Sequence, residues 1–263
     1  MVVRDAPVVS YVEHPLRARR AEVVEVVDVT PRMRRVRLAG DLHDLRADGP
    51  TDHAKVFFPG APGEEPPEPE LSARGLVTPP VGAPRPYREY TIRRHDPVAG
   101  TVDIDMVRHG AGLAGRWIED PRGAVWLLGP RASAVVAPRD WYLLGGDETA
   151  LPALGRWCAA LPAGVSATVF VEVADAAEEQ PLPSAADVTV HWLHRDGPAA
   201  GTTTLLGDAV AGWEPPAGDG VAWMGAEAGA LRPVRRRLRD LLPSEVIDLD
   251  GYWRRGVEGT GLG

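Results

Sequence analysis

Six residues from Arg88 to Arg93 read Arg-Glu-Tyr-Thr-Ile-Arg and carry an unusual set of functional groups for one short strand. Side chains on a strand alternate between its two faces, so Arg88 and Tyr90 are expected on one face and Thr91 and Arg93 on the other. An aromatic ring, a hydroxyl and two guanidinium groups can hold a planar, phosphate-bearing ligand by stacking, hydrogen bonding and bidentate charge pairing. By itself, however, the segment favours an edge strand whose charged face is solvated.

A glycine-rich stretch from Gly110 to Gly115 leads into Arg116-Trp117-Ile118, where the sequence predicts the start of a short helix. Free backbone amides and the helix dipole at such a position favour a diphosphate group. Glycines at a helix start also serve plain turn geometry, so this feature alone is a weak signal. His109 is equally consistent with positioning a cofactor and with a backbone hydrogen bond at a strand end.

A second turn, Gly145-Gly146-Asp147-Glu148-Thr149, follows a buried-type strand and precedes a helix predicted from Thr149 to Leu161. In open α/β sheets, ligands bind at the carboxyl ends of the strands, where this turn would lie. The Gly-x-Gly-x-x-Gly dinucleotide fingerprint is absent. Asp147 or Thr149 can also serve simply as a helix cap, which needs no ligand.

The first half of the chain predicts a barrel of antiparallel strands. Short β-branched or alternating segments occur at 23–29, 33–38, 54–58, 101–107 and 124–128, with one short helix between the last two. Many short strands with a single late helix are typical of an antiparallel barrel. Residues 59–86 are rich in Pro, Gly and Glu, and we interpret them as a mobile surface loop that does not pack.

From Pro138 onward, strands alternate with helices. Strands are predicted at 141–146, 167–173, 188–193, 221–225 and 246–249, and helices at 149–161 and 228–242. This alternation predicts a parallel sheet with flanking helices. We therefore expect two domains, a β-barrel over residues 1–138 and a nucleotide-binding type α/β domain over residues 139–263.

The composition excludes several classes of partner. A formal net charge of −8 argues against nucleic acid and anionic membranes. The single cysteine, Cys158, allows no internal disulfide and is expected to be buried and inert, and no Cys/His cluster has the spacing of a metal site. Because no apolar run has the length of a signal peptide or membrane span, we expect a cytoplasmic protein, and we expect it to be a monomer.

The chemistry-bearing segments together resemble the siderophore-interacting proteins, a ferredoxin-reductase-like family of flavoenzymes that reduce ferric siderophores. Arg88 to Arg93 resembles the family's Arg-x-Tyr-Thr-x-Arg flavin motif. Other matching stretches follow in order along nearly the whole chain: His109-Gly110, Gly129-Pro130-Arg131, Gly146 to Pro152, Glu172-Val173 and Gly251 to Gly256. The resemblance implies that the first domain is a six-stranded FAD-binding barrel and that the second binds NADPH or NADH.

The resemblance also implies which residues hold the cofactors. Tyr90 would pack against the isoalloxazine, Thr91 would hydrogen-bond near its N5, and Arg88 or Arg93 would meet the diphosphate. No side chain is expected to serve as a catalytic acid or base. The other cofactor-binding residues that we expect are His109, Gly110, Gly112, Leu113, Ala114, Gly146, Asp147, Thr149, Ala150 and Trp253.

Three points stay open within this resemblance. The family usually carries Ser or Thr near Gly115, so one phosphate hydrogen bond is missing here. Trp253 is equally consistent with an aromatic over the flavin or adenine and with a residue that seals a sheet edge. Glu172 could meet a ribose hydroxyl and Arg195 a phosphate, which leaves NADH, NADPH and ferredoxin as alternative donors.

The expected substrate is a ferric siderophore, whose hard and often anionic oxygens call for cations beside the flavin. Lys55, Arg131 and Arg254 fall in motifs that contribute such a basic patch in the family, whereas the arginines between 232 and 239 have the spacing of a solvated helix face. We expect FAD-dependent reduction that releases ferrous iron. The alternatives are a general flavin or electron-transfer reductase and a siderophore-binding protein without redox chemistry.

Overall fold

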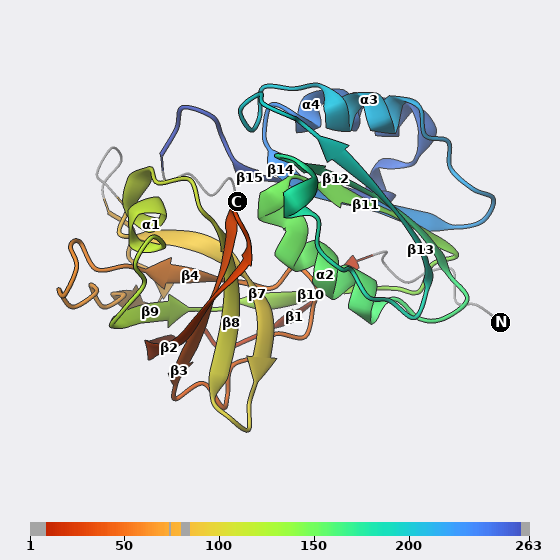
Figure 1. Ribbon diagram of the computed structural model, residues 1–263. Helices are drawn as coiled ribbons and strands as arrows, with labels where there is room; N and C mark the ends of the chain where they lie inside the picture. The colour runs from red at the N-terminus through yellow and green to blue at the C-terminus, as the bar shows by residue number, and fades with distance from the viewer. Residues whose placement is uncertain (1–8, 74, 80–84, 259–263) are drawn as a thin grey trace. The chain divides into compact units, whose positions relative to one another are not determined.

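The computed structural model describes residues 9–73, 75–79 and 85–258 (Figure 1). The chain divides into two compact units. The barrel unit comprises Val12–Ser133 together with Glu258, and the α/β unit comprises Ala134–Val257 together with residues 9–11. Within the described ranges, no helix combines the length and the apolar character that a membrane crossing requires.

The barrel unit is a closed barrel of six antiparallel strands, as predicted. Core side chains from every strand meet inside it, among them Val36, Val56, Ile92, Ile104 and Leu127, all at most 1% exposed. One short helix, α1 (Gly112–Trp117), follows β8. The strands in their order around the barrel are β2 (Ala18–Thr30), β3 (Met33–Gly40), β8 (Thr101–Val107), β7 (Tyr87–Asp96), β4 (His53–Phe57) and β9 (Ala124–Leu128).

The strand pair β3 and β8 shows why the alternating pattern builds this barrel. Val36 and Leu38 of β3 point into the core, and Arg35 and Arg37, which alternate with them, point outward. On the outside, Arg35 and Arg37 form bidentate ion pairs with Asp105 and Asp103 of β8. Apolar and charged residues therefore separate to opposite faces with the period of two that a strand imposes.

The proline-rich segment after β4 packs more than we predicted. Its residues are mostly exposed, but Pro66 and Pro69 are buried, so the prediction of a loop without packing is wrong at these positions. A small hairpin of β5 (Leu71–Ser72) and β6 (Gly75–Leu76) interrupts the segment. Proline rings carry apolar surface and bury it wherever a neighbouring surface is available. Arg74 and residues 80–84 lie outside the described residues.

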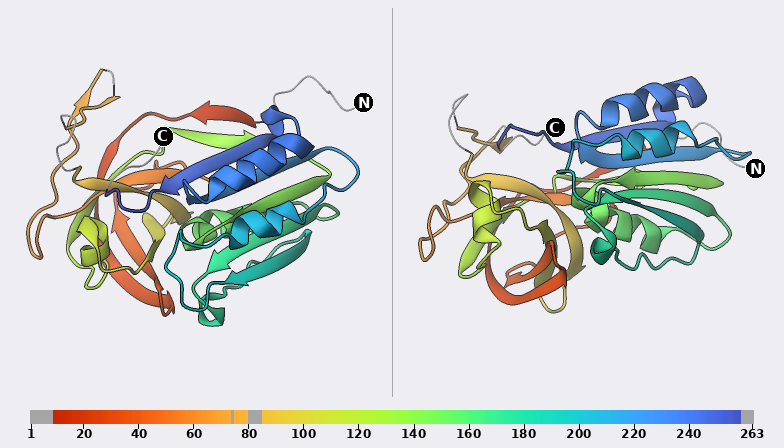
Figure 2. Two further views of the ribbon diagram at one scale, coloured as in Figure 1. Left: turned by 90° about the horizontal axis from the view of Figure 1, so that it is seen from above. Right: turned by 45° about the horizontal axis from the view of Figure 1, so that its top comes forward.

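The α/β unit contains a five-stranded parallel sheet in the order β13-β12-β11-β14-β15, which confirms the predicted fold class. Helix α2 (Leu151–Ala160) covers one face, and α3 (Leu205–Ala211) and α4 (Leu231–Leu241) cover the other (Figure 2). The strands are β11 (Trp141–Gly146), β12 (Ser166–Val173), β13 (Asp187–His194), β14 (Gly220–Glu227) and β15 (Ile247–Trp253). A separate two-stranded sheet pairs β1 (Val9–Glu13) with β10 (Ala132–Val136).

Two helices begin later than predicted. Residues Glu148–Ala150 form a 3-10 turn, and α2 starts only at Leu151, with Pro152 in its first turn where a missing N–H costs nothing. Helix α4 starts at Leu231 rather than at 228. Val234 and Leu238 pack inward. The prediction of a solvated basic face is confirmed for the arginines at 232, 236 and 239, whereas Arg235 and Arg237 are half-buried and donate to backbone carbonyls.

Candidate functional site

In the barrel unit, Arg88 and the start of α1 form a corner that holds an anionic group. A guanidinium nitrogen of Arg88 donates to a carboxylate oxygen of Glu258 at 2.9 Å. A Cβ on Gly112 would lie 3.0 Å from the same oxygen, and Gly112 has a positive φ of 69°. The carboxylate therefore lies against bare glycine backbone and a cation. This is the chemistry that a diphosphate needs, so these residues fit the phosphate end of a cofactor.

His109 packs over the same helix where Gly115 leaves room for it. A Cβ on Gly115 would lie 2.6 Å from Cε1 of the imidazole, closer than real contacts allow. Nδ1 of His109 accepts a hydrogen bond from the backbone N–H of Ala111 at 3.3 Å, so a proton on the neutral ring sits on Nε2. Desolvation lowers the pKa of His109, and the Arg88 charge lowers it further against the opposing effect of Glu119. Gly115 thus makes room for a neutral imidazole.

We expect Gly115→Ala to push the imidazole of His109 off α1. The ring is the far end of a short side chain and can swing away, and alanine favours a helix over glycine by about 0.5–1 kcal/mol, so the protein should stay folded. The pKa of His109 should then rise toward its ordinary value, because the ring loses the partial burial against α1 that lowers it. An NMR titration of the imidazole in both proteins measures this change. An unchanged His109 pKa would contradict the packing described above.

The remaining residues of the β7 motif have different surroundings. The ring of Tyr90 packs on the barrel core edge-on to Phe58, with centroids 6.2 Å apart, and burial raises the pKa of its hydroxyl. Thr91 is 6% exposed. Arg93 lies 3.7 Å from Asp105, which also binds Arg35 on the outside of the barrel. Of the two arginines predicted for a diphosphate, Arg88 is therefore the one beside the start of α1.

The three residues predicted on the substrate side have separate environments. Lys55 forms an ion pair with Glu89, and although burial opposes the change, this lysine lowers the pKa of Glu89. Arg131 is exposed and borders a cavity of about 300 Å³ with Glu13 and His14. Arg254, in the α/β unit, is exposed after β15. Among the described residues, no group of three or more His, Cys, Asp or Glu side chains is placed to hold a metal ion.

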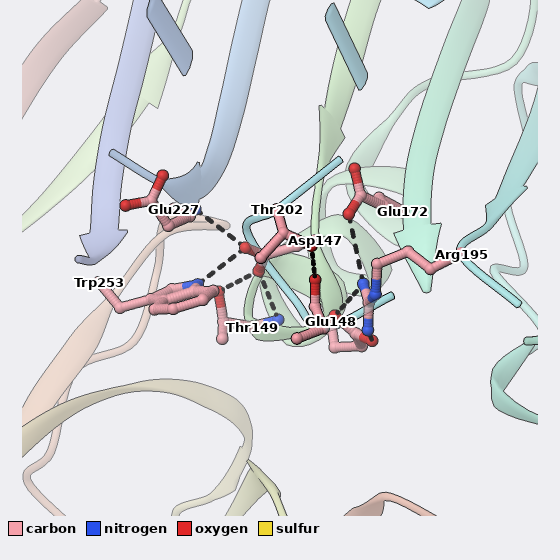
Figure 3. A network of polar contacts seen from close by, with 9 residues as sticks. Asp147, Glu148, Thr149, Glu172, Arg195, Thr202, Glu227 and Trp253 are labelled. Carbon is pink, nitrogen blue, oxygen red and sulfur yellow. Dashed lines mark hydrogen bonds and ion pairs between the residues drawn. The ribbon is translucent and has the colours of Figure 1, made fainter. Parts of the chain in front are cut away.

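In the α/β unit, Asp147 organises the turn after β11 (Figure 3). One carboxylate oxygen accepts from the backbone N–H of Thr149 at 2.9 Å and from its hydroxyl. The other accepts from the backbone N–H of Glu227 at 2.9 Å and from the indole N–H of Trp253 at 2.8 Å. The carboxylate joins the ends of β11, β14 and β15, so the helix-cap interpretation of Asp147 is confirmed and its role extends to the neighbouring strands.

This arrangement separates residues that shape the turn from residues that a ligand can reach. Asp147 is 5% exposed and Ala150 is fully buried. A Cβ on Gly146 would lie 2.0 Å from the carbonyl oxygen of Gly225, so only glycine allows β11 and β14 to approach here. Thr149 and Trp253 are the partly exposed members of the predicted set in this unit. Trp253 ends the edge strand β15, and its indole N–H is held by Asp147, so both interpretations of this residue stay predictions.

Arg195 lies between two carboxylates beside this turn (Figure 3). Its guanidinium donates to Glu148 at 3.0 Å and to Glu172 at 3.4 Å, and the residues Arg195, Glu148 and Glu172 are 7%, 5% and 4% exposed. The interpretations of Glu172 as a ribose ligand and Arg195 as a phosphate ligand are therefore wrong in this arrangement. The Arg195 guanidinium is shared between the two carboxylates in the interior.

The pKa of Asp147 should produce a measurable pH dependence of stability. Burial raises it to about 6, assisted by the Glu148 charge and opposed by the donated hydrogen bonds. The folded state then binds the proton more tightly than the unfolded chain, whose aspartates titrate near 4. The unfolding free energy should accordingly fall as the pH rises from about 4 to about 6, by roughly 3 kcal/mol through this group at about 1.4 kcal/mol per pKa unit.

Urea unfolding of the wild-type protein and of Asp147→Asn between pH 4.5 and 7.5 measures this effect. The variant leaves two donors without acceptors and is expected to be less stable throughout, but it lacks the titrating group. The stability difference between the two proteins should therefore shrink as the pH rises. Parallel curves would show that Asp147 keeps an ordinary pKa.

Sequence reasoning missed Glu258 and Glu227. Glu258 lies 170 residues from Arg88, and a glutamate near the end of a chain carries no pattern that predicts such a contact. Glu227 ends β14, where its own backbone N–H meets Asp147. The one available signal was the position of acidic residues at the carboxyl ends of predicted strands, which applies to Glu172 and Glu227 alike.

Comparison with known protein families accounts for both units. Residues 22–134 match the family described as "Siderophore-interacting FAD-binding domain". Residues 139–256 match the family described as "Siderophore-interacting protein".

Three known proteins illustrate the similarity. A siderophore utilization protein from T. fusca has a crystal structure that is 42% identical, with 97% of this chain and 98% of that one covered and a TM-score of 0.87. The ferric vibriobactin reductase ViuB of Vibrio cholerae is 29% identical over 247 residues, with 87% and 86% covered. The ferredoxin-NADP+ reductase of Plasmodium falciparum has a TM-score of 0.61 at 9% identity, with 88% and 95% covered, which shows a shared ferredoxin-reductase-like fold alone.

Proposed function

Because the chain belongs to the siderophore-interacting protein family, we propose that it is an FAD-dependent ferric-siderophore reductase. The observation that supports this proposal most directly is the corner of the barrel unit where Arg88 and Gly112 hold the carboxylate of Glu258. Arg88 and Gly112 lie within the residues that match an FAD-binding domain. A relative that covers most of the chain is named as a ferric vibriobactin reductase, which supports the reductase activity.

The proposed roles follow from the chemistry of each side chain. Bound FAD would supply the conversion of a two-electron donor into single-electron transfer to one ferric ion. Arg88 and the start of α1 would hold the diphosphate, Tyr90 and Thr91 would orient the ring system, and neutral His109 would donate from Nε2. Ferrous iron binds hard oxygen donors more weakly than ferric iron, so reduction would release the metal from its carrier.

The substrate side of the proposal rests on exposed cations. Arg131 and Arg254 are exposed and can meet anionic oxygens directly. Lys55 would first have to leave Glu89, so we expect it to contribute less than Arg131. The electron donor in the proposal is NADPH, NADH or a ferredoxin. We further propose that the protein acts in the cytoplasm as a monomer, with the domain boundary near Pro138.

An anaerobic visible spectrum of the purified protein tests this function. The protein is reconstituted with FAD, then given NADH, NADPH or reduced ferredoxin, and finally a ferric siderophore. A flavin band that bleaches with a donor and recovers when the ferric complex is added supports the reductase. A protein that binds the ferric complex but takes up no FAD would be a siderophore-binding protein without redox chemistry.

The same assay separates the proposal from a general electron-transfer reductase. Arg131→Ala should raise the siderophore concentration needed for half-maximal reoxidation, because it removes an exposed cation from the proposed substrate side. Arg236→Ala, an exposed arginine on α4, provides the matched control. Equal behaviour of both variants and wild type would favour the general reductase.

A further inference from the structure

In the α/β unit, acidic side chains are available and basic side chains are already paired at the place where the adenosine half of a dinucleotide would bind. In a sheet of the order β13-β12-β11-β14-β15, the strand order reverses at β11, and ligands bind outside the carboxyl ends near that strand. In dinucleotide-binding sheets of this kind, the residues after the second strand of the unit meet the adenine ribose. That strand here is β12, which ends at Val173.

The segment after β12 is acidic. Asp175, Glu178 and Glu179 follow the strand within six residues. The backbone N–H of Ala177 donates to Oδ1 of Asp175 at 2.9 Å, which fixes the orientation of this half-exposed carboxylate. A carboxylate held in this way accepts a hydrogen bond from a ribose 2′-hydroxyl but repels a 2′-phosphate, which carries between one and two negative charges at neutral pH.

The two basic residues at the end of the neighbouring strand are already paired. His194 lies 2.9 Å from Glu179. Arg195 is 93% buried between Glu148 and Glu172, and turning it toward a phosphate would leave two buried carboxylates without their cation. Such an exchange is strongly unfavourable, because an uncompensated buried charge is among the costliest changes in a protein. Arg195 is thus unavailable to a 2′-phosphate.

We propose that this edge of the α/β unit selects NADH over NADPH, with Asp175 as the acceptor for the 2′-hydroxyl of the adenine ribose. The inference rests on the proposed function, in which a nicotinamide nucleotide is one of the donors. It narrows that choice and names a specificity residue. Glu172 and Arg195 support the selection indirectly. Because they are buried and paired with each other, neither side chain is available to bind the nucleotide.

Direct binding tests the proposal without relying on turnover. The full chain, with and without FAD, is titrated with NADH and with NADPH, and binding is followed by energy transfer from tryptophan to the reduced nicotinamide. The wild-type protein should bind NADH at least 10-fold more tightly than NADPH. Asp175→Ser removes the charge but keeps a capping oxygen for Ala177. It should bring the two affinities within about 3-fold of each other.

Two further variants sharpen the test. Asp187→Ser removes an exposed carboxylate at the start of β13, where the strands of the same sheet have their amino ends. It should leave the preference for NADH over NADPH unchanged. Asp175→Ser combined with Ala176→Arg places a guanidinium at the ribose and should improve NADPH binding at least 10-fold over wild type. Tighter binding of NADPH by the wild type, or an unchanged ratio in Asp175→Ser, would overturn the proposal.

The failure of this proposal can be distinguished from the failure of the proposed function. If neither nucleotide binds, the selectivity proposal is overturned. The proposed function then still stands if FAD that has been reduced chemically on the protein is reoxidised by a ferric siderophore. If reoxidation also fails, both proposals are overturned.

Discussion

Replacing Arg88 by Ala is expected to weaken FAD binding by about 10- to 100-fold. A hydrogen bond to a charged group contributes about 1.5–3 kcal/mol, and Arg88 is the cation beside the start of α1 in the barrel unit. The barrel itself should persist, because the guanidinium lies outside the apolar core. Titration of the FAD-free protein with FAD, followed by the quenching of flavin fluorescence, measures the loss.

Arg93→Ala is the matched control, since it removes the same group from the same strand. Arg93 lies beside Asp105 on the outside of the barrel, so its loss should change FAD affinity by less than about 3-fold. Glu258→Gln should change affinity in the opposite direction to Arg88→Ala. It removes a carboxylate that competes for Arg88, and because this carboxylate is largely exposed, tighter binding of about 2- to 5-fold is expected. Equal losses in the two arginine variants would show that Arg88 has no special role.

The second large effect is expected at Arg195 in the α/β unit. Arg195→Met should lower the free energy of unfolding by about 3–5 kcal/mol, because it leaves Glu148 and Glu172 buried without a cation. Denaturant unfolding followed by tryptophan fluorescence measures the change. Arg236→Met on the exposed face of α4 is the control and should cost less than about 0.5 kcal/mol.

A compensated variant separates charge from packing at this position. Arg195→Met combined with Glu148→Leu and Glu172→Leu removes all three charges and should recover most of the lost stability, since buried ion clusters can be replaced by apolar groups of similar volume. If the combined variant is as unstable as Arg195→Met, shape rather than charge explains the loss. If Arg195→Met alone is as stable as wild type, the buried ion cluster makes no net contribution.

The prediction of the fold from the sequence succeeded where pattern and period agree. Alternating strands such as Met33–Gly40 sort their side chains by local geometry, and alternating strands and helices after Pro138 leave a parallel sheet as the favoured arrangement. Element ends were less accurate. The helix after Asp147 begins two residues late because the Asp147 side chain and Pro152 shape its first turn.

The candidate site was predictable only in part, because motifs do not show which residues lie opposite one another in the fold. Motif order identified the family and singled out Arg88, Gly112, His109 and Asp147. It did not distinguish Arg88 from Arg93, because the two differ in what lies opposite them and not in their own chemistry. Only the folded structure brings Glu258 to Arg88 and places Asp105 beside Arg93.

The sequence by itself thus determined the fold class, the family and the segments that carry chemistry, since these depend on residue type, period and order along the chain. The tertiary structure alone decided which charged groups are available to a ligand. Glu172 and Arg195 looked like ribose and phosphate ligands until the fold placed Arg195 between Glu148 and Glu172 and buried all three. Charge availability depends on contacts between residues far apart in the chain, and no local pattern encodes those contacts.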